Sequence, residues 1–412
     1  MKPVHFKKLR SGYTTGACAA AAAKGATLLL LEQKTVRDVT IGLPGGGSAT
    51  FQLHGQAFNS EIASCFVIKD AGDDPDITNG AELHAAVSLS PHEGEGIVQI
   101  AGGIGIGKMT KPGLAVAPGE WAINPVPRRM IEQAIREAFS LLPAPQPPVA
   151  AKVTISIPDG EERAKKTLNA RLGIIGGLSI LGTTGIVKPI SAKAWTDTID
   201  AALDVARACA CPTVVLSTGR TSEMAAQRAY WNRGTGTRNQ GPGTGERGPG
   251  SRDNRMILPV PDPTSHVPVF LPVPGPRSHV PSLPEEAYIM MGDHVAYALQ
   301  ACQKRGFHHP IVACQFAKLL KIACGHPNTH AAASELDLAT LRTWAEQAHL
   351  APELVQMISG ANTAREIAVT SRFDPTLTGL VSRMAEQAAA THAPGIMAGF
   401  LLCGYDGVVH QT

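Results

Sequence analysis

The stretch PTVVLSTGRTSE, residues 212–223, decides the fold of the second half of the chain. Its apolar start predicts a short buried strand over residues 213–217. Its small polar residues predict a turn at Gly219, followed by a helix over residues 222–230. A further helix is predicted before it, over residues 192–208. A buried strand that passes through a glycine turn into a helix is typical of a parallel sheet covered by helices.

The same strand-to-helix pattern recurs further along the chain. The expected elements are a strand over residues 287–291, a Gly292-Asp293 turn, a helix that ends at Arg305, a strand over residues 311–314 and a helix over residues 316–323. This repetition predicts βαβ units and a Rossmann-like domain over residues 192–330. Residues 331–412 are predicted to be a mostly helical C-terminal segment that packs on the two domains.

Residues 1–191 show a different pattern, in which short strands and helices are interleaved. The expected strands lie over residues 36–41, 64–69, 96–101 and 152–157, and the expected helices over residues 18–32 and 128–142. This mixture predicts an α+β domain. The predicted fold class is therefore α/β and α+β, with an α+β N-terminal domain followed by a Rossmann-like βαβ domain and C-terminal helices.

Residues 232–284 interrupt the predicted Rossmann-like domain. They are rich in glycine and in Val-Pro and Leu-Pro steps, with little amphipathic periodicity. Such a segment buries too little apolar surface to offset the entropy lost on ordering, so a disordered or polyproline-like insertion is expected. An inert loop and an arm that docks a partner both stay open. Deletion of residues 235–282 is expected to leave activity largely intact.

The composition excludes several classes of protein. The 412 residues carry 37 Lys and Arg against 34 Asp and Glu, a net charge of +3, which argues against a nucleic-acid binder. No stretch approaches 18 uninterrupted apolar residues, so no membrane span is expected. The basic, alanine-rich start imitates a secretory signal, but Lys24 interrupts its apolar run. Eight cysteines without a repeated CxxC pattern fit reduced thiols, and a cytoplasmic protein is expected.

Four turns of small residues are suited to hold anions through backbone N–H groups and hydroxyls. They lie at residues 12–16, 102–107, 181–185 and 217–223, and nearby cations would supply complementary charge. The residues expected to bind a substrate with several negative groups are Arg10, Tyr13, Thr14, Thr15, Arg128, Thr183, Thr184, Lys188, Lys318 and Lys321. For any one turn, a purely structural role is the alternative.

The turn after Ser217 lies where parallel sheets bind nucleotides, because a helix N-terminus and open backbone meet there at the carboxyl end of a strand. The residues expected to bind a nucleotide-like cofactor are Thr218, Gly219, Ser222, Glu223, Gly292 and Asp293. Glu223 or Asp293 would accept hydrogen bonds from ribose hydroxyls or from an amino group. Glu223 also fits the spacing of a helix-capping residue, and both interpretations stay open.

The segment DAGDDPD, residues 70–76, places four carboxylates within seven residues. A solvated turn is the simplest interpretation. A hard-cation site and a carboxylate that moves protons are the functional alternatives, although the spacing does not match a calcium loop. His326 and His330 have helical ligand spacing, but Pro327 lies between them and no third ligand is evident. No protein metal site is expected.

Stretches spread over nearly the whole chain resemble one family. They are LRSGYTTGAC (9–18), KDAGDDPDIT (69–78), INPVPR (123–128), NARLGI (169–174), SILGTTGIVKP (179–189), TGRTSE (218–223), MGD (291–293), KLLKIA (318–323) and TH (329–330). In this order they resemble the cobalt-precorrin-5B C-1 methyltransferases of the anaerobic cobalamin pathway. Residues 232–284 depart from the short connection that this family has there.

The resemblance implies S-adenosylmethionine as the methyl-donating cosubstrate and a cobalt-bearing tetrapyrrole as the acceptor. The implied product is cobalt-precorrin-6A, with cobalt present only as part of the substrate. Neighbouring enzymes of the pathway are implied as partners, and the fold is expected to differ from that of the pathway's usual methyltransferases. His330 joins the substrate-binding residues through this resemblance.

The residues themselves agree with this chemistry. A polycarboxylate ring needs several anion-binding turns, and methyl transfer from a sulfonium needs mainly alignment and exclusion of water. If a base removes a proton, Asp70, Asp73 and Asp74 are the catalytic candidates. Two alternatives stay open: a non-catalytic carrier of corrinoid intermediates, and a nucleotide-dependent enzyme of another class.

Overall fold

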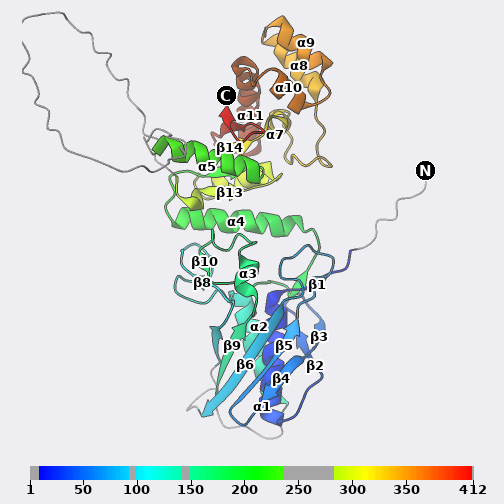
Figure 1. Cartoon of the computed structure of the whole chain (residues 1–412), viewed down its shortest axis with the longest axis vertical. Helices are drawn as coiled ribbons and strands as arrows, with labels where there is room; N and C mark the ends of the chain where they lie inside the picture. The colour runs from blue at the N-terminus through cyan, green and yellow to red at the C-terminus, as the bar shows by residue number, and fades with distance from the viewer. Residues whose placement is uncertain (1–8, 92–97, 142–148, 235–282, 411–412) are drawn as a thin grey trace, which may run out of the picture.

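The N-terminal half is built on a five-stranded sheet of order β4-β5-β6-β9-β7 (Figure 1). The computed structural model describes residues 9–91, 98–141, 149–234 and 283–410. The strands are β4 (His54–Phe58), β5 (Ile62–Ile68), β6 (Glu82–Pro91), β7 (Val98–Gly102) and β9 (Val149–Ser156). Neighbouring strands run antiparallel, except that β7 is parallel to β9. Along β5, Ala63, Cys65 and Val67 are buried while the residues between them are more exposed, as expected for a sheet covered on one face.

Two helices, α1 (Thr15–Glu32) and α2 (Pro125–Ser140), pack on one another and cover this sheet. All residues from Thr15 to Ala23 are buried, because alanine side chains let α1 lie close to its neighbours on every side. The two helices run parallel: a Cβ at Gly16 would lie 2.8 Å from the Pro127 ring, and Lys24 Nζ lies 2.7 Å from Glu137 Oε2 further along. Both N-termini therefore lie at the same end of the domain core.

Short elements complete the N-terminal half. They are β1 (Gly12–Tyr13), β2 (Asp38–Gly42), β3 (Ser48–Gln52), β8 (Lys108–Met109), α3 (Gly160–Ala164), β10 (Ile174–Ile175) and β11 (Ile186–Val187). The antiparallel pairs are β1 with β11, β2 with β3 and β8 with β10. The β1–β11 pair connects the start of the chain to a loop near residue 185.

The C-terminal half is built on a second five-stranded sheet of order β13-β12-β14-β15-β16. Its strands are β12 (Val215–Ser217), β13 (Tyr288–Met290), β14 (Ile311–Cys314), β15 (Gly399–Cys403) and β16 (Val409–His410). The first four are parallel, and β16 is antiparallel to β15. The chain goes from β12 outward to β13 and then returns to β14 on the other side of β12. The order therefore reverses between β12 and β14.

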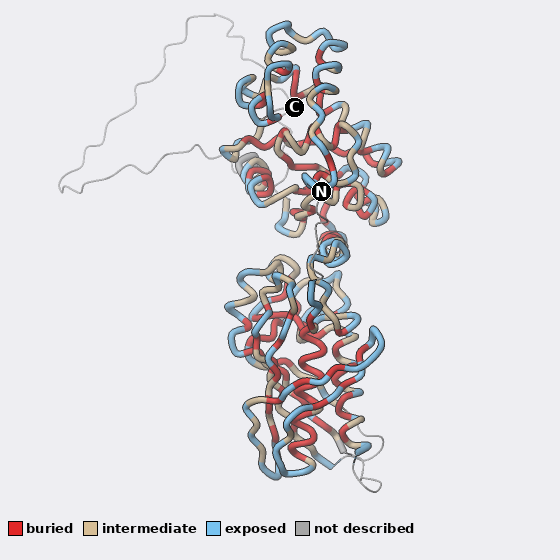
Figure 2. The backbone as a smooth tube through the Cα atoms, turned by 90° about the vertical axis from the view of Figure 1, so that its right-hand side faces the viewer, coloured by how far each residue is buried: buried red, intermediate tan, exposed pale blue. Residues whose placement is uncertain are grey.

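Helices cover both faces of the second sheet. They are α4 (Ala192–Ala208), α5 (Arg220–Gly234), α6 (Val295–Lys304), α7 (Phe316–Ala323), α8 (Leu338–Gln347), α9 (Pro352–Gly360), α10 (Ala364–Thr370) and α11 (Pro375–His392), with a 3₁₀ turn at Glu285–Ala287. Val215 packs with α5 on one face, whereas Leu216 packs in the cluster that includes α4, α6, α7 and α11 on the other. In Figure 2, buried residues (red) are present in each half.

The mixed α/β prediction is confirmed, and two differences have physical reasons. The C-terminal segment contains four helices, but it also supplies β15 and β16 to the second sheet. The apolar run GFLLC was not predicted as a strand because a buried strand of this length has no periodicity that separates it from helix. Helix α5 continues to Gly234, beyond the predicted start of the insertion at residue 232. Residues 235–282 lie outside the described residues, so the predicted disorder of the insertion stays a prediction.

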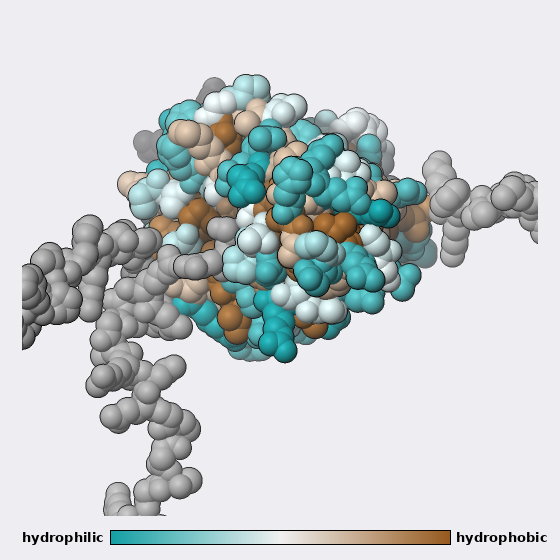
Figure 3. Space-filling view, turned by 90° about the horizontal axis from the view of Figure 1, so that it is seen from above, coloured by the Kyte–Doolittle hydropathy of each residue, from teal (hydrophilic) through white to brown (hydrophobic). Residues whose placement is uncertain are grey.

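The surface seen from above, at the end that carries α8 and α9, shows hydrophilic residues with hydrophobic residues interspersed (Figure 3). Among the helices within the described ranges, none has the length and apolarity that a membrane crossing requires.

Candidate functional site

The acidic loop, residues 69–80, is bound to the start of the chain by charge and by backbone. The Arg10 guanidinium forms a two-point ion pair with Asp70, whose Oδ1 also accepts the Gly72 N–H at 2.8 Å. These partners, first of all Arg10, hold the pKa of Asp70 below its usual value. The Arg10 N–H donates to Asp73 Oδ2 at 2.7 Å, and the Asp73 N–H donates to the Arg10 carbonyl at 2.9 Å. Two of the three predicted carboxylates therefore hold the loop against residue 10.

This contact requires glycine on both sides. A Cβ at Gly12 would lie 2.1 Å from the carbonyl carbon of Ala71, and a Cβ at Gly72 would lie 2.2 Å from the Arg10 carbonyl oxygen. Gly72 also has a φ of +70°, which favours glycine. The backbones of β1 and the acidic loop are therefore in direct contact, with no room for a side chain between them.

We expect Gly12→Ala to destabilise the protein by about 1–3 kcal/mol or more, because the added methyl group meets backbone that cannot rotate away. Urea unfolding measures the loss. Gly399→Ala is the matched control, because a Cβ at that exposed glycine meets no atom within 4 Å. Equal stability of the two variants would contradict the close approach.

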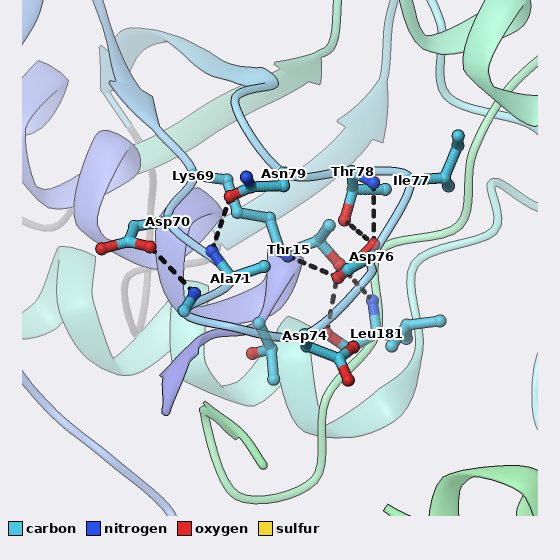
Figure 4. Close-up of polar contacts among 12 residues, drawn as sticks. Thr15, Lys69, Asp70, Ala71, Asp74, Asp76, Ile77, Thr78, Asn79 and Leu181 are labelled. Carbon is cyan, nitrogen blue, oxygen red and sulfur yellow. Dashed lines mark hydrogen bonds and ion pairs between the residues drawn. The ribbon is translucent and has the colours of Figure 1, made fainter. Parts of the chain in front are cut away.

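A third segment, residues 181–190, joins these two at the N-terminus of α1. Thr14 caps the helix by accepting the Ala17 N–H at 3.2 Å, and its own N–H donates to Gly185. Thr15 Oγ1 accepts the Leu181 N–H at 2.9 Å and donates to the Leu181 carbonyl at 3.2 Å (Figure 4). Both threonines are buried, so their hydroxyls fix the loop and do not face solvent.

Asp74 connects the acidic loop to the end of this third segment. Its Oδ1 accepts the Ile190 N–H at 2.9 Å. Asp70 and Asp73 are exposed and contact Arg10, whereas Asp74 is half-buried and its side chain is bonded to Ile190 instead. Among the three predicted carboxylates, Asp74 is therefore the one least involved in holding residue 10.

A buried ion pair lies beneath the acidic loop. The Lys69 side chain is only 1% exposed, and its Nζ lies 2.6 Å from Asp76 Oδ2 (Figure 4). The other oxygen of Asp76 accepts the Thr78 N–H at 2.7 Å and the Thr78 hydroxyl at 2.6 Å. Burial alone would raise the pKa of Asp76, but Lys69 and Thr78 outweigh burial and lower it. No role was predicted for Lys69, and Asp76 was counted only among the four carboxylates of the loop, although a lysine that ends an apolar strand before an acidic loop is a usable signal.

The other predicted substrate-binding residues of this half differ in their contacts and exposure. The Tyr13 ring packs against Phe51, with ring centroids 4.7 Å apart. Arg128 Nε donates to the Ile123 carbonyl at 2.9 Å and its Nη2 to the Trp121 carbonyl at 3.4 Å, so part of its guanidinium is already paired. Thr183, Thr184 and Lys188 are exposed on the 181–190 segment.

The glycine-rich turn at residues 102–107 does not join this cluster. Gly105 has a φ of +70°, and a Cβ there would lie 1.9 Å from the Ile157 carbonyl oxygen and 3.0 Å from Gly160. The glycines of this turn therefore allow close packing against residues 157–160. Of the other predicted turns, those at residues 12–16 and 181–185 meet beside the acidic loop, and the one at residues 217–223 lies at the second sheet, whereas this turn has a packing role.

The predicted cofactor residues lie at the carboxyl edge of the second sheet. The Gly292 N–H donates to the Ser217 carbonyl at 3.2 Å, which places the ends of β12 and β13 together. A Cβ at Gly219 would meet no atom within 4 Å, so the backbone there is open to a ligand. Ser222 is buried, and its hydroxyl lies 3.5 Å from that of Thr218. This edge is also where the strand order reverses.

Asp293 brings together predicted cofactor and substrate residues. Its Oδ1 accepts a hydrogen bond from Lys318 and one from the Thr329 hydroxyl at 2.7 Å. Burial would raise the pKa of Asp293, but these two donors lower it. Lys321 donates to the carbonyls of Thr329 and Ser334, at 3.3 and 2.9 Å, and burial lowers its pKa. His330 is exposed on the adjoining loop.

Glu223 is fully buried in an ion-pair network that joins the two halves of the chain. Arg171, from the N-terminal half, binds both of its oxygens, with Nη2 3.1 Å from Oε2. Arg220 Nη1 binds Oε2 at 2.8 Å. Both oxygens are therefore already paired with protein cations, which favours the structural interpretation of Glu223, and its predicted role in cofactor binding stays a prediction. Arg171 lies in the NARLGI stretch, but no local pattern pairs it with a residue 52 positions away.

Two clusters result. One gathers Arg10, Thr14, Thr15, Asp70, Asp73 and Asp74, and the other gathers Thr218, Gly219, Ser222, Gly292, Asp293, Lys318, Lys321 and His330. Within the residues that the structure describes, no group of three or more His, Cys, Asp or Glu side chains is arranged to hold a metal ion.

These features define a mixed α/β protein with small-residue turns and charged side chains gathered at two places, the N-terminus of α1 and the carboxyl edge of a mostly parallel sheet. The CbiD family profile matches residues 2–189, and that of the CbiD C-terminal domain matches residues 328–411. The chain belongs to the CbiD family.

Curated relatives are similar over nearly their whole length. The chain is 57% identical to the cobalt-precorrin-5B C(1)-methyltransferase of Pelobacter propionicus, over 99% of this chain and 97% of that protein. It is 52% identical to the protein of the same name from Geobacter metallireducens, over 98% of this chain and 99% of the relative. A crystal structure of the cobalamin biosynthesis protein cbiD from Archaeoglobus fulgidus matches at 25% identity, with a TM-score of 0.35, over 76% of this chain and 78% of that chain.

Proposed function

We propose that this chain transfers a methyl group to C-1 of cobalt-precorrin-5B and so forms cobalt-precorrin-6A. The observation that carries the proposal is the 57% identity over nearly the full length to a relative named for this reaction. The structure adds support, because segments far apart in the sequence meet at Asp74 and at Asp293. S-adenosylmethionine is the methyl donor, and cobalt enters as part of the substrate.

The chain is divided into an α+β domain over residues 1–191 and a Rossmann-like domain that begins at residue 192. The support for this division is the presence of one hydrophobic core cluster around α1 and a second around β12 and β14. The Rossmann-like domain extends past residue 330, because β15 belongs to its sheet.

The donor binds at the carboxyl edge of the second sheet. Parallel sheets bind ligands outside the strand ends where the strand order reverses, and here that position lies between β12 and β14. Thr218 and Gly219 follow β12 directly, and the open space beside Gly219 accommodates a ligand next to the backbone. Asp293 lies one residue beyond Gly292, and its carboxylate accepts hydrogen bonds from polar groups of the donor. Bound there, the donor supplies an electrophilic methyl group.

The acceptor binds along residues 181–190 and the acidic loop. Arg128, Lys188 and the exposed hydroxyls of Thr183 and Thr184 meet its carboxylates, and Lys318, Lys321 and His330 meet those that reach the second sheet. Thr14 and Thr15 act indirectly, because they fix the loop that carries these groups.

The protein's contribution to the chemistry is alignment and proton transfer. A methyl group moves in line from a sulfonium to a ring carbon, so orientation and exclusion of water account for most of the rate enhancement. Asp74 is the base that takes a proton from the ring as its electrons rearrange, since Asp70 and Asp73 are committed to Arg10.

One assay tests the function. Purified full-length protein is incubated with methyl-labelled S-adenosylmethionine and cobalt-precorrin-5B, and NMR locates the new carbon. Label at C-1 supports the proposal. A protein that binds the tetrapyrrole without transferring label is a carrier, and one that binds ATP but not S-adenosylmethionine belongs to another enzyme class.

A further inference from the structure

Ile190 combines three properties that are rarely found in one residue. Its side chain is 75% exposed, its φ is +52°, and its N–H donates to Asp74. A β-branched residue in the left-handed region is a conformational outlier, and such strain persists only where surrounding contacts impose it. Here the imposed conformation keeps a large apolar side chain in solvent beside the proposed base.

Trp195, five residues further along in the first turns of α4, is positioned by separate contacts. Its Nε1–H donates to the Met291 carbonyl at 2.9 Å. Its ring lies against Gly292, where a Cβ would be only 2.8–3.0 Å from ring atoms and where φ is +60°. The indole nevertheless remains 44% exposed. An aromatic side chain is thus held beside the turn that precedes Asp293, with much of its surface open.

A structural explanation for the pair is a hydrophobic staple. Ser191 caps α4, so Ile190 and Trp195 occupy the positions whose side chains pack together in that motif. A staple stabilises a helix by removing the two side chains from water. The exposure of Ile190 shows that this packing does not take place here, and a staple does not explain the left-handed backbone.

The segment from Ile190 to Trp195 also joins the two clusters. One end is bonded to Asp74 in the acidic loop, and the other end touches Gly292 at the edge of the second sheet. A fully extended chain covers at most about 3.5 Å per residue, so the two contacts lie within about 18 Å of each other along this segment. Both side chains are exposed on the short segment that joins the two clusters.

We propose that Ile190 and Trp195 form the apolar surface that receives the face of the tetrapyrrole ring and thereby determine specificity for it. This inference rests on the proposed function. A tetrapyrrole carries carboxylates at its edge and apolar faces, so polar turns hold the edge while exposed apolar side chains are needed for the face. The strained backbone of Ile190 keeps its side chain available for that contact.

The test compares Ile190→Asn with Ile104→Asn. Asparagine tolerates the left-handed conformation, so Ile190→Asn removes apolar surface without adding strain. Ile104 is 74% exposed, and its turn packs against Ile157, so it is matched in exposure but separate from the acidic loop. Binding is measured with cobalt uroporphyrin III, a cobalt tetrapyrrole that carries acetate and propionate groups. Ile190→Asn is expected to weaken binding about tenfold or more, as for loss of one buried aliphatic side chain, and Ile104→Asn less than about twofold.

Steady-state kinetics and thermal unfolding complete the test. Ile190→Asn should raise KM for the tetrapyrrole with KM for S-adenosylmethionine unchanged, and its Tm should be equal to or above that of the wild type. Ile190→Leu keeps an aliphatic side chain and should bind the probe about as well as the wild type. Unchanged binding by Ile190→Asn, or a Tm that falls with activity, would overturn the inference. If the wild type binds the probe in an Ile190-dependent way but transfers no methyl group, the inference stands and the proposed function fails.

Discussion

Asp74→Asn is expected to lower kcat by at least about 100-fold while the protein stays folded. Positioned general bases contribute about 10²–10⁴-fold to enzyme rates, and asparagine cannot accept the proton. The substitution keeps the shape of the side chain and an Oδ1 that accepts the Ile190 N–H, so the contact at 2.9 Å survives. Single-turnover methyl transfer, measured with labelled donor, separates this effect from slow product release.

Asp73→Asn is the matched control. It removes one charge from the same loop while keeping the oxygen that accepts the Arg10 N–H. The variant should retain kcat within about tenfold, since Asp73 holds the loop through that bond and does not take the proton. Near-normal methylation by Asp74→Asn, or equal losses in the two variants, would remove Asp74 as the base.

Lys69→Met is expected to cost about 3–5 kcal/mol of stability. It removes the cation of a buried pair and leaves the Asp76 carboxylate beneath the loop with Thr78 as its remaining donor. Urea unfolding at pH 7 measures the loss. Lys24→Met is the comparison, because that lysine is paired with the more exposed Glu137 and its removal should cost less.

The pH dependence of stability tests whether Lys69 is the group that lowers the pKa of Asp76. The pKa of Asp76 is lowered on folding, so its stabilising contribution is present above its unfolded pKa, about 4, and is lost as pH falls through the folded value. Wild-type stability should therefore fall in acid below about pH 4. Lys69→Met should show a smaller fall there. An equally steep acid loss in both proteins would contradict the assignment of Lys69 as the group that lowers the pKa.

The sequence predicted those features that depend on neighbouring residues. The apolar run before Ser217 and the glycine after it predicted a strand, a turn and a helix, and β12 and α5 lie there. The acidic loop was identified because four carboxylates stand close together. Its position against Arg10 could not be derived, because that contact depends on a close approach of glycines 60 residues apart.

Long-range ion pairs were the main features that the sequence did not reveal. Glu223 has the spacing of a capping residue, yet its principal partner is Arg171 in the other half of the chain. Ile190 was missed for a related reason, since neither its exposure nor its left-handed backbone follows from composition. Strand β15 was missed because a short apolar run that is buried on both faces has no periodicity that separates strand from helix.

The alanine-rich helix α1 has a consequence for how its end is fixed. Alanine has no rotamers to lose on burial, so ordering residues 17–23 costs side-chain entropy only at Cys18. Longer side chains would lose about 0.5–2 kcal/mol each in the same position. The helix therefore holds Thr14 and Thr15 at its N-terminus at a small cost in side-chain entropy. Because most of its residues are fully buried, a larger side chain along this helix would displace α2 or the sheet.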